Sequence, residues 1–117
     1  MKIYISTPIN ARPEKTFSQK YIAASRRVGE IQGYLIMHGY KDAEFVSFVD
    51  VAPLGECTEA QAMGRCVQAV IESDICLIDE VDVDMFLKSS GCITERFVAL
   101  RYRKTIIDFH DIVNAKQ

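Results

Sequence analysis

The chain has 117 residues and a formal net charge of −2, with 49% hydrophobic and 26% charged residues. This length fits one domain, residues 1–117, with a real hydrophobic core. The charge balance gives no reason to expect DNA, RNA or an anionic membrane as partner, although backbone amides can still bind a small anion such as phosphate. No apolar run approaches the roughly 20 residues that span a bilayer, and the opening MKIYISTPIN is too polar for a signal peptide. We therefore expect a cytoplasmic protein.

The cysteines and histidines show no spacing typical of a metal site or a disulfide framework. Three of the four cysteines lie inside apolar helix or strand patterns, which predicts small buried side chains. The residues concerned are Cys57, Cys66, Cys76 and Cys92, with His38 and His110 far apart at the ends of predicted elements.

The first half of the chain predicts a strand, a long helix and a second strand. Residues 2–6, KIYIS, are rich in β-formers and end in turn residues. From about 14 to 38, apolar residues recur every three or four positions, which predicts one buried helical face, and Gly39 then supplies the left-handed residue that ends it. The stretch AEFVSFVDV, residues 43–51, predicts the second strand.

The second half continues the alternation. Thr58 and Gln61 form a capping-box signature that opens a helix. The nearly continuous apolar run DICLIDE, 74–80, is typical of a strand covered on both faces. An acidic, irregular loop over 81–88 leads to a third helix, and TIIDF, 105–109, predicts the last strand before a short tail.

The order β-α-β-α-β-α-β predicts a parallel sheet with helices on both faces, an α/β three-layer arrangement. We expect four strands in the flavodoxin-like order 2-1-3-4. In such sheets ligands bind beyond the carboxyl ends of the strands where the winding direction switches, here between the first and third strands. Residues 6–10 and 79–95 should therefore meet in one crevice.

The stretch SSGCITE, residues 89–95, has the features of an anion site at a helix start. Ser89 or Ser90 can cap the helix, and Gly91 allows a ligand to approach the backbone closely. The free N–H groups and the helix dipole favour a negative ligand.

Glu95 lies one turn further on, without a basic residue at a position suited to a helical ion pair. Its helical neighbours are Val98, Ala99 and Tyr102. This setting favours a buried, functional carboxylate, and the alternative is a partly exposed glutamate on an ordinary capped helix.

Two other segments flank the same crevice. The loop after the first strand contributes polar side chains and backbone amides from Ser6, Thr7, Pro8, Ile9 and Asn10. The acids Asp79, Glu80, Asp82 and Asp84 are compatible with a Mg²⁺ site, but a solvated acidic loop is the favoured interpretation.

Three stretches in this order resemble the nucleoside 2-deoxyribosyltransferase-like superfamily, in particular a small bacterial and phage branch that begins MKIYISGPI. They are MKIYISTPI at the start, MGRCVQAVIESDICLID in the middle and SSGCITERFVA near the end, so the resemblance covers most of the chain.

The resemblance implies a role for each part of the crevice. Glu95 matches the family nucleophile, which attacks the anomeric carbon of a 2′-deoxynucleoside or its monophosphate. Ser89 matches a serine that binds the phosphate in monophosphate-specific glycosidases, and Ser90 and Gly91 would lie beside it. Residues 6–10 would hold the base or the sugar. No metal or organic cofactor is needed, and relatives commonly form homodimers or larger homo-oligomers.

The chain departs from the family pattern at three positions. Cys66 stands where the family carries an aspartate that helps to protonate or orient the leaving base. Ile93 replaces a glycine and would narrow the pocket, and Phe97 replaces another small residue. Two functions therefore stay open: an N-glycosidase or deoxyribosyltransferase, or a nucleotide-binding module with weak or no activity.

Overall fold

The computed structural model describes residues 1–80 and 82–115, and a four-stranded parallel sheet forms its centre. The strands are β1 (Lys2–Ser6), β2 (Glu44–Val46), β3 (Ile75–Ile78) and β4 (Thr105–Asp108). Their order is β2-β1-β3-β4, and every neighbouring pair is parallel. The predicted α/β class, three-layer architecture and strand order are confirmed.

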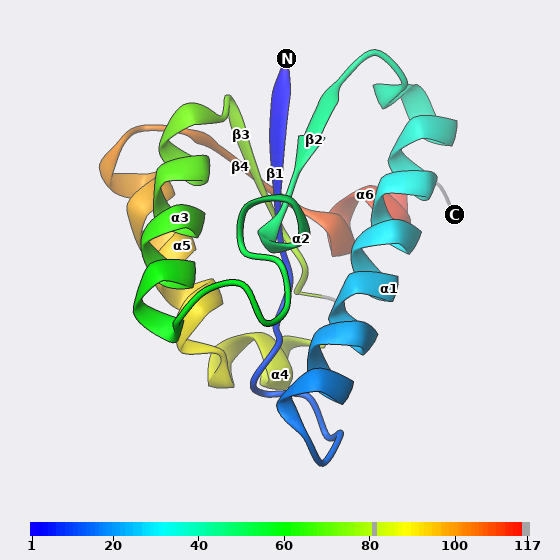
Figure 1. Cartoon of the computed structure of the whole chain (residues 1–117). Helices are drawn as coiled ribbons and strands as arrows, with labels where there is room; N and C mark the ends of the chain where they lie inside the picture. Colours follow the sequence, from blue (N-terminus) through cyan, green and yellow to red (C-terminus); the bar gives the residue numbers. More distant parts are fainter. Residues whose placement is uncertain (81, 116–117) are drawn as a thin grey trace.

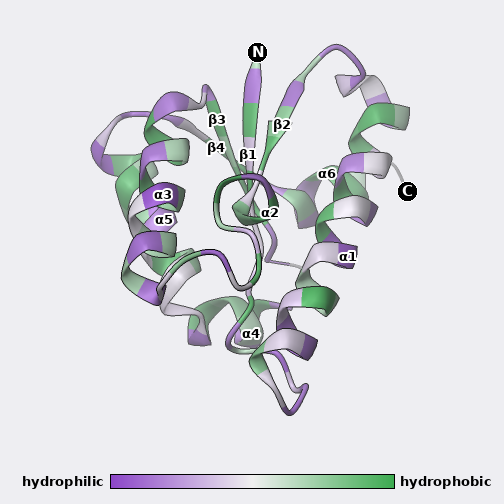
Figure 2. Ribbon diagram, in the orientation of Figure 1, coloured by the Kyte–Doolittle hydropathy of each residue, from purple (hydrophilic) through white to green (hydrophobic). Residues whose placement is uncertain are grey.

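Helices cover both faces of the sheet (Figure 1). On one side lie α1 (Phe17–Leu35) and α6 (Phe109–Ala115), and on the other lie α3 (Glu59–Glu72) and α5 (Ser90–Arg101). Hydrophobic residues, drawn in green, are frequent in the strands and on the sides of the helices that face the sheet (Figure 2). The sheet is therefore the middle layer, buried on both faces.

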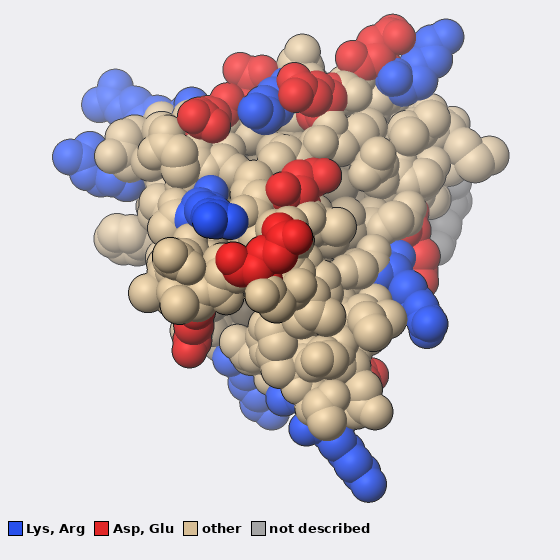
Figure 3. All heavy atoms as spheres, viewed as in Figure 1, with Lys and Arg blue, Asp and Glu red and all other residues tan. Residues whose placement is uncertain are grey.

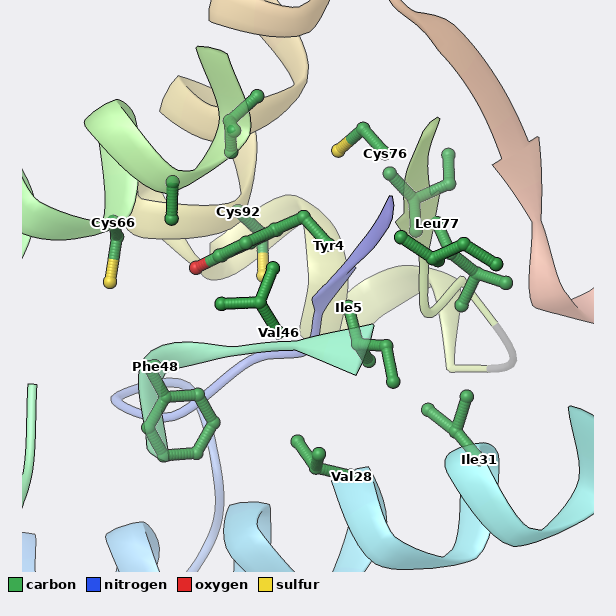
Figure 4. Close-up of a cluster of buried hydrophobic side chains, with 14 of the residues drawn as sticks. Tyr4, Ile5, Val28, Ile31, Val46, Phe48, Cys66, Cys76, Leu77 and Cys92 are labelled. Atoms are coloured by element: carbon green, nitrogen blue, oxygen red, sulfur yellow. The ribbon is translucent and has the colours of Figure 1, made fainter. Parts of the chain in front are cut away.

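Alternation along β1 assigns its side chains to the two layers. Ile5 points toward Val28 and Ile31 of α1, whereas Tyr4 points to the opposite face, toward Cys66 of α3 (Figure 4). Ser6 is two residues after Tyr4 and shares its face. This alternation delivers two hydroxyl groups from β1 to the α3/α5 side.

The second strand is shorter than predicted. Residues 43–51 were expected to be extended, but β2 ends at Val46, and α2 (Phe48–Val51) follows. Ser47 caps α2: its hydroxyl accepts from the Val49 amide, and the Asp50 carboxylate accepts from the Ser47 amide at 2.9 Å. This local capping box competes with the strand and ends it early.

Two segments expected to be irregular are helical. The acidic loop contains α4 (Val83–Lys88), which begins where the Asp82 carboxylate accepts from the Met85 amide. The expected C-terminal tail forms α6 directly after β4. Both helices are about two turns long, so their apolar periodicity is too brief to recognise in the sequence.

The long first helix begins at a capping box formed by Thr16 and Gln19. It runs to Leu35 and continues into a π-helical turn, η1 (Ile36–Tyr40). Gly39 has φ of +104°, the left-handed conformation expected of it at the helix end.

Charges of both signs are interspersed over the viewed face of the molecule (Figure 3). Within residues 1–80 and 82–115, no helix combines the length and the apolar character needed to cross a membrane. All four cysteines are free thiols, and Cys66, Cys76 and Cys92 are buried as predicted.

Candidate active site at the carboxyl edge of the sheet

Glu95 is a buried carboxyl group on the inner face of α5. Only 7% of its surface is exposed, and the helix buries Cys92 and Ala99 on the same face. These residues are spaced three and four apart, so they form one helical stripe against the sheet. None of the ion pairs found among the described residues involves Glu95.

Two hydroxyl groups from β1 hold the Glu95 carboxylate. The Tyr4 hydroxyl donates to Oε2 at 2.6 Å, and the Ser6 hydroxyl donates to Oε1 at 2.7 Å. Both donors are buried, with Tyr4 and Ser6 each 1% exposed. Each carboxylate oxygen therefore has a fixed partner, which sets the orientation of the group without neutralising its charge.

Burial raises the pKa of Glu95 to about 7, although hydrogen bonds from Ser6 and Tyr4 and a weaker interaction with the Cys66 thiol oppose the rise. Burial and the nearby Glu95 likewise raise the pKa of the Tyr4 hydroxyl well above its usual value. The site thus contains a carboxyl group that changes charge near neutral pH.

A cavity of about 560 Å³ opens over this carboxyl group. Its volume is in the range of small-molecule sites. Its walls come from the β1 loop, the start of α1, the segment from α2 to α3, and the start of α5. The cavity therefore lies at the carboxyl edge of the sheet, where the topology places ligand sites.

One wall of the cavity is aromatic and apolar. Phe17, Tyr21 and Phe48 form a row, with ring centroids 6.2 Å apart for the first pair and 5.0 Å for the second. Phe17 is 52% exposed, whereas the other two rings are buried. Pro53 and Leu54 also line the cavity. This wall suits a planar ring.

The opposite end is polar. Ser89 caps α5, its hydroxyl accepting from the Cys92 amide at 3.2 Å, so Ser89 rather than Ser90 supplies the cap. Ser90, Gly91 and the exposed Lys88 line the cavity beside it. A Cβ at Gly91 would meet nothing closer than Ser89 Oγ at 3.9 Å, so packing within the chain does not require a glycine there.

The residues predicted to flank the crevice at the end of β1 lie in different surroundings. Thr7, Ile9 and Asn10 line the cavity, and Ser6 lies beneath it against Glu95. Pro8 does not line this cavity and instead borders a smaller hollow of about 100 Å³.

The Thr7 side chain belongs to a network that fixes this loop. Its hydroxyl donates to Asp79 Oδ2 at 2.6 Å, and Arg27 of α1 binds both Asp79 oxygens at 3.0 Å each. Arg27 also lies 5.3 Å from the ring centroid of Phe109. Asp79 therefore joins α1 to the β1 loop.

Three of the four acids of the 79–84 segment make contacts within the fold, and Asp84 is exposed. Asp79 pairs with Arg27, Asp82 caps α4, and Glu80 lies 3.4 Å from Arg96. Across residues 1–80 and 82–115, no group of three or more histidines, cysteines and acids is placed to hold a metal ion.

Of the three positions at which the sequence departs from the pattern of the family that it resembles, two lie away from the cavity. Ile93 is 39% exposed on the outer face of α5 and does not line the cavity, so the expected narrowing at Ile93 is wrong. Phe97 is one turn further along the same outer face. Cys66, in contrast, is buried in the cavity wall beside Tyr4 and Glu95 (Figure 4).

Several residues of this site were not predicted from the sequence. Tyr4 could have been predicted, because it precedes Ser6 by two residues in a strand and side chains two apart share a face. The aromatic wall and Lys88 had no comparable signal, since they come from separate elements that only the folded chain brings together.

No family model matches this chain, and neither a curated protein nor a solved structure matches it.

Proposed function

We propose that this protein cleaves the N-glycosidic bond of a nucleotide, with Glu95 as the nucleophile. The main support is a buried carboxylate that has two hydroxyl partners and, among the described residues, no cationic one, at the floor of a cavity that has an aromatic wall and a polar end. The resemblance to deoxyribosyltransferase-like proteins, stated above from the sequence alone, predicts the same glutamate.

In this proposal the base lies against the aromatic row of Phe17, Tyr21 and Phe48. The phosphate lies near Ser89, Ser90, Gly91 and Lys88, where the start of α5 offers free amides and the lysine offers a positive charge. Thr7, Ile9 and Asn10 would contact the sugar or base. The anomeric carbon then lies over Glu95.

The proposed reaction is a double displacement. A Glu95 oxygen bonds to the anomeric carbon, and the bond from that carbon to the base nitrogen breaks. Water, or a second base in a transferase, then attacks the same carbon and releases the carboxylate, and the proton lost by the attacking group balances the one taken up by the departed base. The Tyr4 and Ser6 hydrogen bonds orient the nucleophile for the first step.

The first experiment is a thermal-shift screen of deoxynucleotides and nucleotides, followed by chromatography of each hit for released base. A bound ligand stabilises the folded chain in proportion to the logarithm of its excess over Kd. We expect release of base by the wild type, loss of release in Glu95→Gln, and no change in Glu72→Gln, which alters an exposed glutamate near the end of α3. An active Glu95→Gln enzyme would disprove the mechanism.

A second function, nucleotide binding without cleavage, is favoured by the neighbour of Glu95. Cys66 provides a thiol where efficient release of a neutral base needs a stronger acid. Stabilisation by a nucleotide that stays intact over hours, in both wild type and Glu95→Gln, would establish the binding module instead.

We also infer that the chain assembles as a homodimer or larger homo-oligomer. The outer face of α5 supports this inference, because Ile93, Phe97 and Leu100 form an exposed apolar stripe at spacings of four and three. Such stripes mark interaction surfaces in soluble proteins.

A further inference from the structure

Among the residues that the structure describes, Glu95 has no second carboxyl group as a partner in the cavity. Among the described residues that line it, Glu59 is the other carboxylic acid. Glu59 is the first residue of α3, and Cys66, which neighbours Glu95, is seven residues later. The helix rise separates these two positions by about 10 Å. Retaining glycosidases hold their two carboxyl groups only about 5 Å apart, whereas among the described residues no second carboxyl group hydrogen-bonds to Glu95 or shifts its pKa.

The groups that do surround Glu95 are poor proton donors. The Tyr4 and Ser6 hydroxyls already donate to the Glu95 oxygens. Burial and the nearby Glu95 raise the pKa of the Cys66 thiol to about 11. General acids work best with a pKa near the working pH, so a departing base receives little help from these groups at neutral pH.

The lack of a good proton donor matters only for some leaving groups. A neutral purine or pyrimidine departs from the sugar as an anion and needs a proton as the bond breaks. A base that already carries a positive charge departs as a neutral molecule and needs no proton. A carboxylate nucleophile alone is sufficient for the second class.

The aromatic wall also favours a positively charged ring. The faces of Phe and Tyr rings attract cations within about 6 Å of their centroids. Phe17, Tyr21 and Phe48 line the cavity together with the exposed carboxylate of Glu59, which adds negative charge. Phe17, the most exposed ring of the row at 52%, and the Glu59 carboxylate would therefore attract a cationic base more strongly than a neutral one.

We propose that the substrates of this site are nucleotides with a positively charged base, such as pyridinium nucleotides or N7-alkylated purine nucleotides. This inference rests on the proposed N-glycosidase function. In the first step the electron pair of the broken bond neutralises the positive ring. In the second step water bonds to the anomeric carbon, Glu95 is released as the carboxylate, and the proton of water passes to solvent.

The test compares 7-methyl-2′-deoxyguanosine monophosphate with 2′-deoxyguanosine monophosphate, which differ by one methyl group and one charge. The other neutral deoxynucleotides and nicotinamide mononucleotide are assayed alongside. Released base is measured by chromatography, and each rate is divided by the rate with Glu95→Gln, which corrects for the greater spontaneous lability of the methylated compound. We expect the ratio to be at least about 100-fold larger for the cationic substrates, the usual contribution of a general acid.

The outcomes separate the two levels of the proposal. Equal acceleration of neutral and cationic nucleotides would overturn the substrate inference and leave the N-glycosidase function standing. Acceleration of neither would overturn the N-glycosidase function itself. Acceleration of the cationic compounds alone supports both.

Two variants of Cys66 provide an independent check. Cys66→Asp adds a carboxylic acid beside Glu95, and Cys66→Ser is the matched control of similar size without one. We expect Cys66→Asp to raise the rate on neutral nucleotides more than 10-fold relative to Cys66→Ser, with little gain on cationic ones. A folded Cys66→Asp protein with no gain on neutral nucleotides would contradict the inference. If that variant fails to fold, the wild-type substrate ratio decides.

Discussion

At the scale of single residues, the burial of Glu95 beside the cavity lowers the stability of the folded chain when the carboxyl group is charged. Its pKa in the folded chain is about 7, against an ordinary value of 4.5, because burial penalises the charged form. Between these two values the folded chain holds a proton that the unfolded chain has lost. Stability therefore falls as pH rises through this window and is constant above it.

Glu95→Gln should remove this pH dependence, because an amide stays neutral. We expect the variant to be more stable than the wild type at pH 8, by as much as roughly 3 kcal/mol, and about equal to it near pH 4.5. Urea denaturation at the two pH values measures the difference. Glu72→Gln serves as the exposed control and should show no such trend. A Glu95→Gln variant less stable than wild type at pH 8 would contradict the prediction.

A substitution at Gly91 tests whether a ligand binds at the polar end of the cavity. Its added Cβ would meet only Ser89 Oγ at 3.9 Å and Met63 Cε at 4.0 Å, so Gly91→Ala should fold and gain up to about 1 kcal/mol from helix propensity. Gly64→Ala is the matched control, with open space around its Cβ.

Only Gly91→Ala should weaken the thermal shift caused by a nucleotide, because its methyl group projects into the cavity. An unchanged shift in Gly91→Ala would place the ligand elsewhere.

The residues of the site were predictable to different degrees. Glu95 was recognisable because an acid without a basic partner lay on an apolar helical stripe. Ser6 and Thr7 were recognisable because they lie at the end of a strand beside the crevice. The apolar periodicity over residues 14–38 predicts that Phe17 belongs to the buried face of the first helix, yet it is 52% exposed and borders the cavity. Periodicity assigns a residue to a face, but it does not say whether that face meets core or cavity.

At the scale of elements, local capping chemistry explains the differences between the predicted and observed boundaries. Ser47 and Asp50 end β2 early, and Asp82 begins a helix inside an acidic segment. The buried central strands were predicted well, because continuous apolar runs are long enough to read. Short helices are stabilised by one cap and a few contacts, which leave a weak signal.

The Arg27–Asp79 pair should be the strongest electrostatic link between elements. Asp79 is 5% exposed, so removal of Arg27 leaves a buried charge whose remaining side-chain hydrogen bond, among the described residues, is with Thr7. Arg27→Met should destabilise the chain by roughly 3 kcal/mol. Arg26→Met, on the same helix with an exposed side chain, should change stability by less than about 0.5 kcal/mol. Denaturant titration of the two variants measures the contrast, and equal effects would show that the pair contributes nothing specific.

At the scale of the whole molecule, the apolar stripe on α5 predicts assembly. Phe97 and Leu100 are 69% and 60% exposed and lie with Ile93 on one helix face. Phe97→Glu should reduce the mass measured by light scattering to that of a single chain. Met37→Glu is the control, because Met37 is 83% exposed in η1, after the helix that covers the other face of the sheet. A wild-type chain that is already monomeric at high concentration would refute the inference.

The position of the cavity has a mechanical consequence for the molecule. Its walls draw on α1 from one helical layer and on α3 and α5 from the other. Besides the central sheet, the α2 segment joins the two layers: Tyr21 of α1 packs against Phe48, and Arg65 of α3 donates to the Val51 carbonyl at 3.3 Å. A molecule bound in the cavity would contact both helical layers and restrict their motion relative to each other. Amide hydrogen exchange should then slow in α1 and α5 together when the ligand binds, although they lie on opposite sides of the strands.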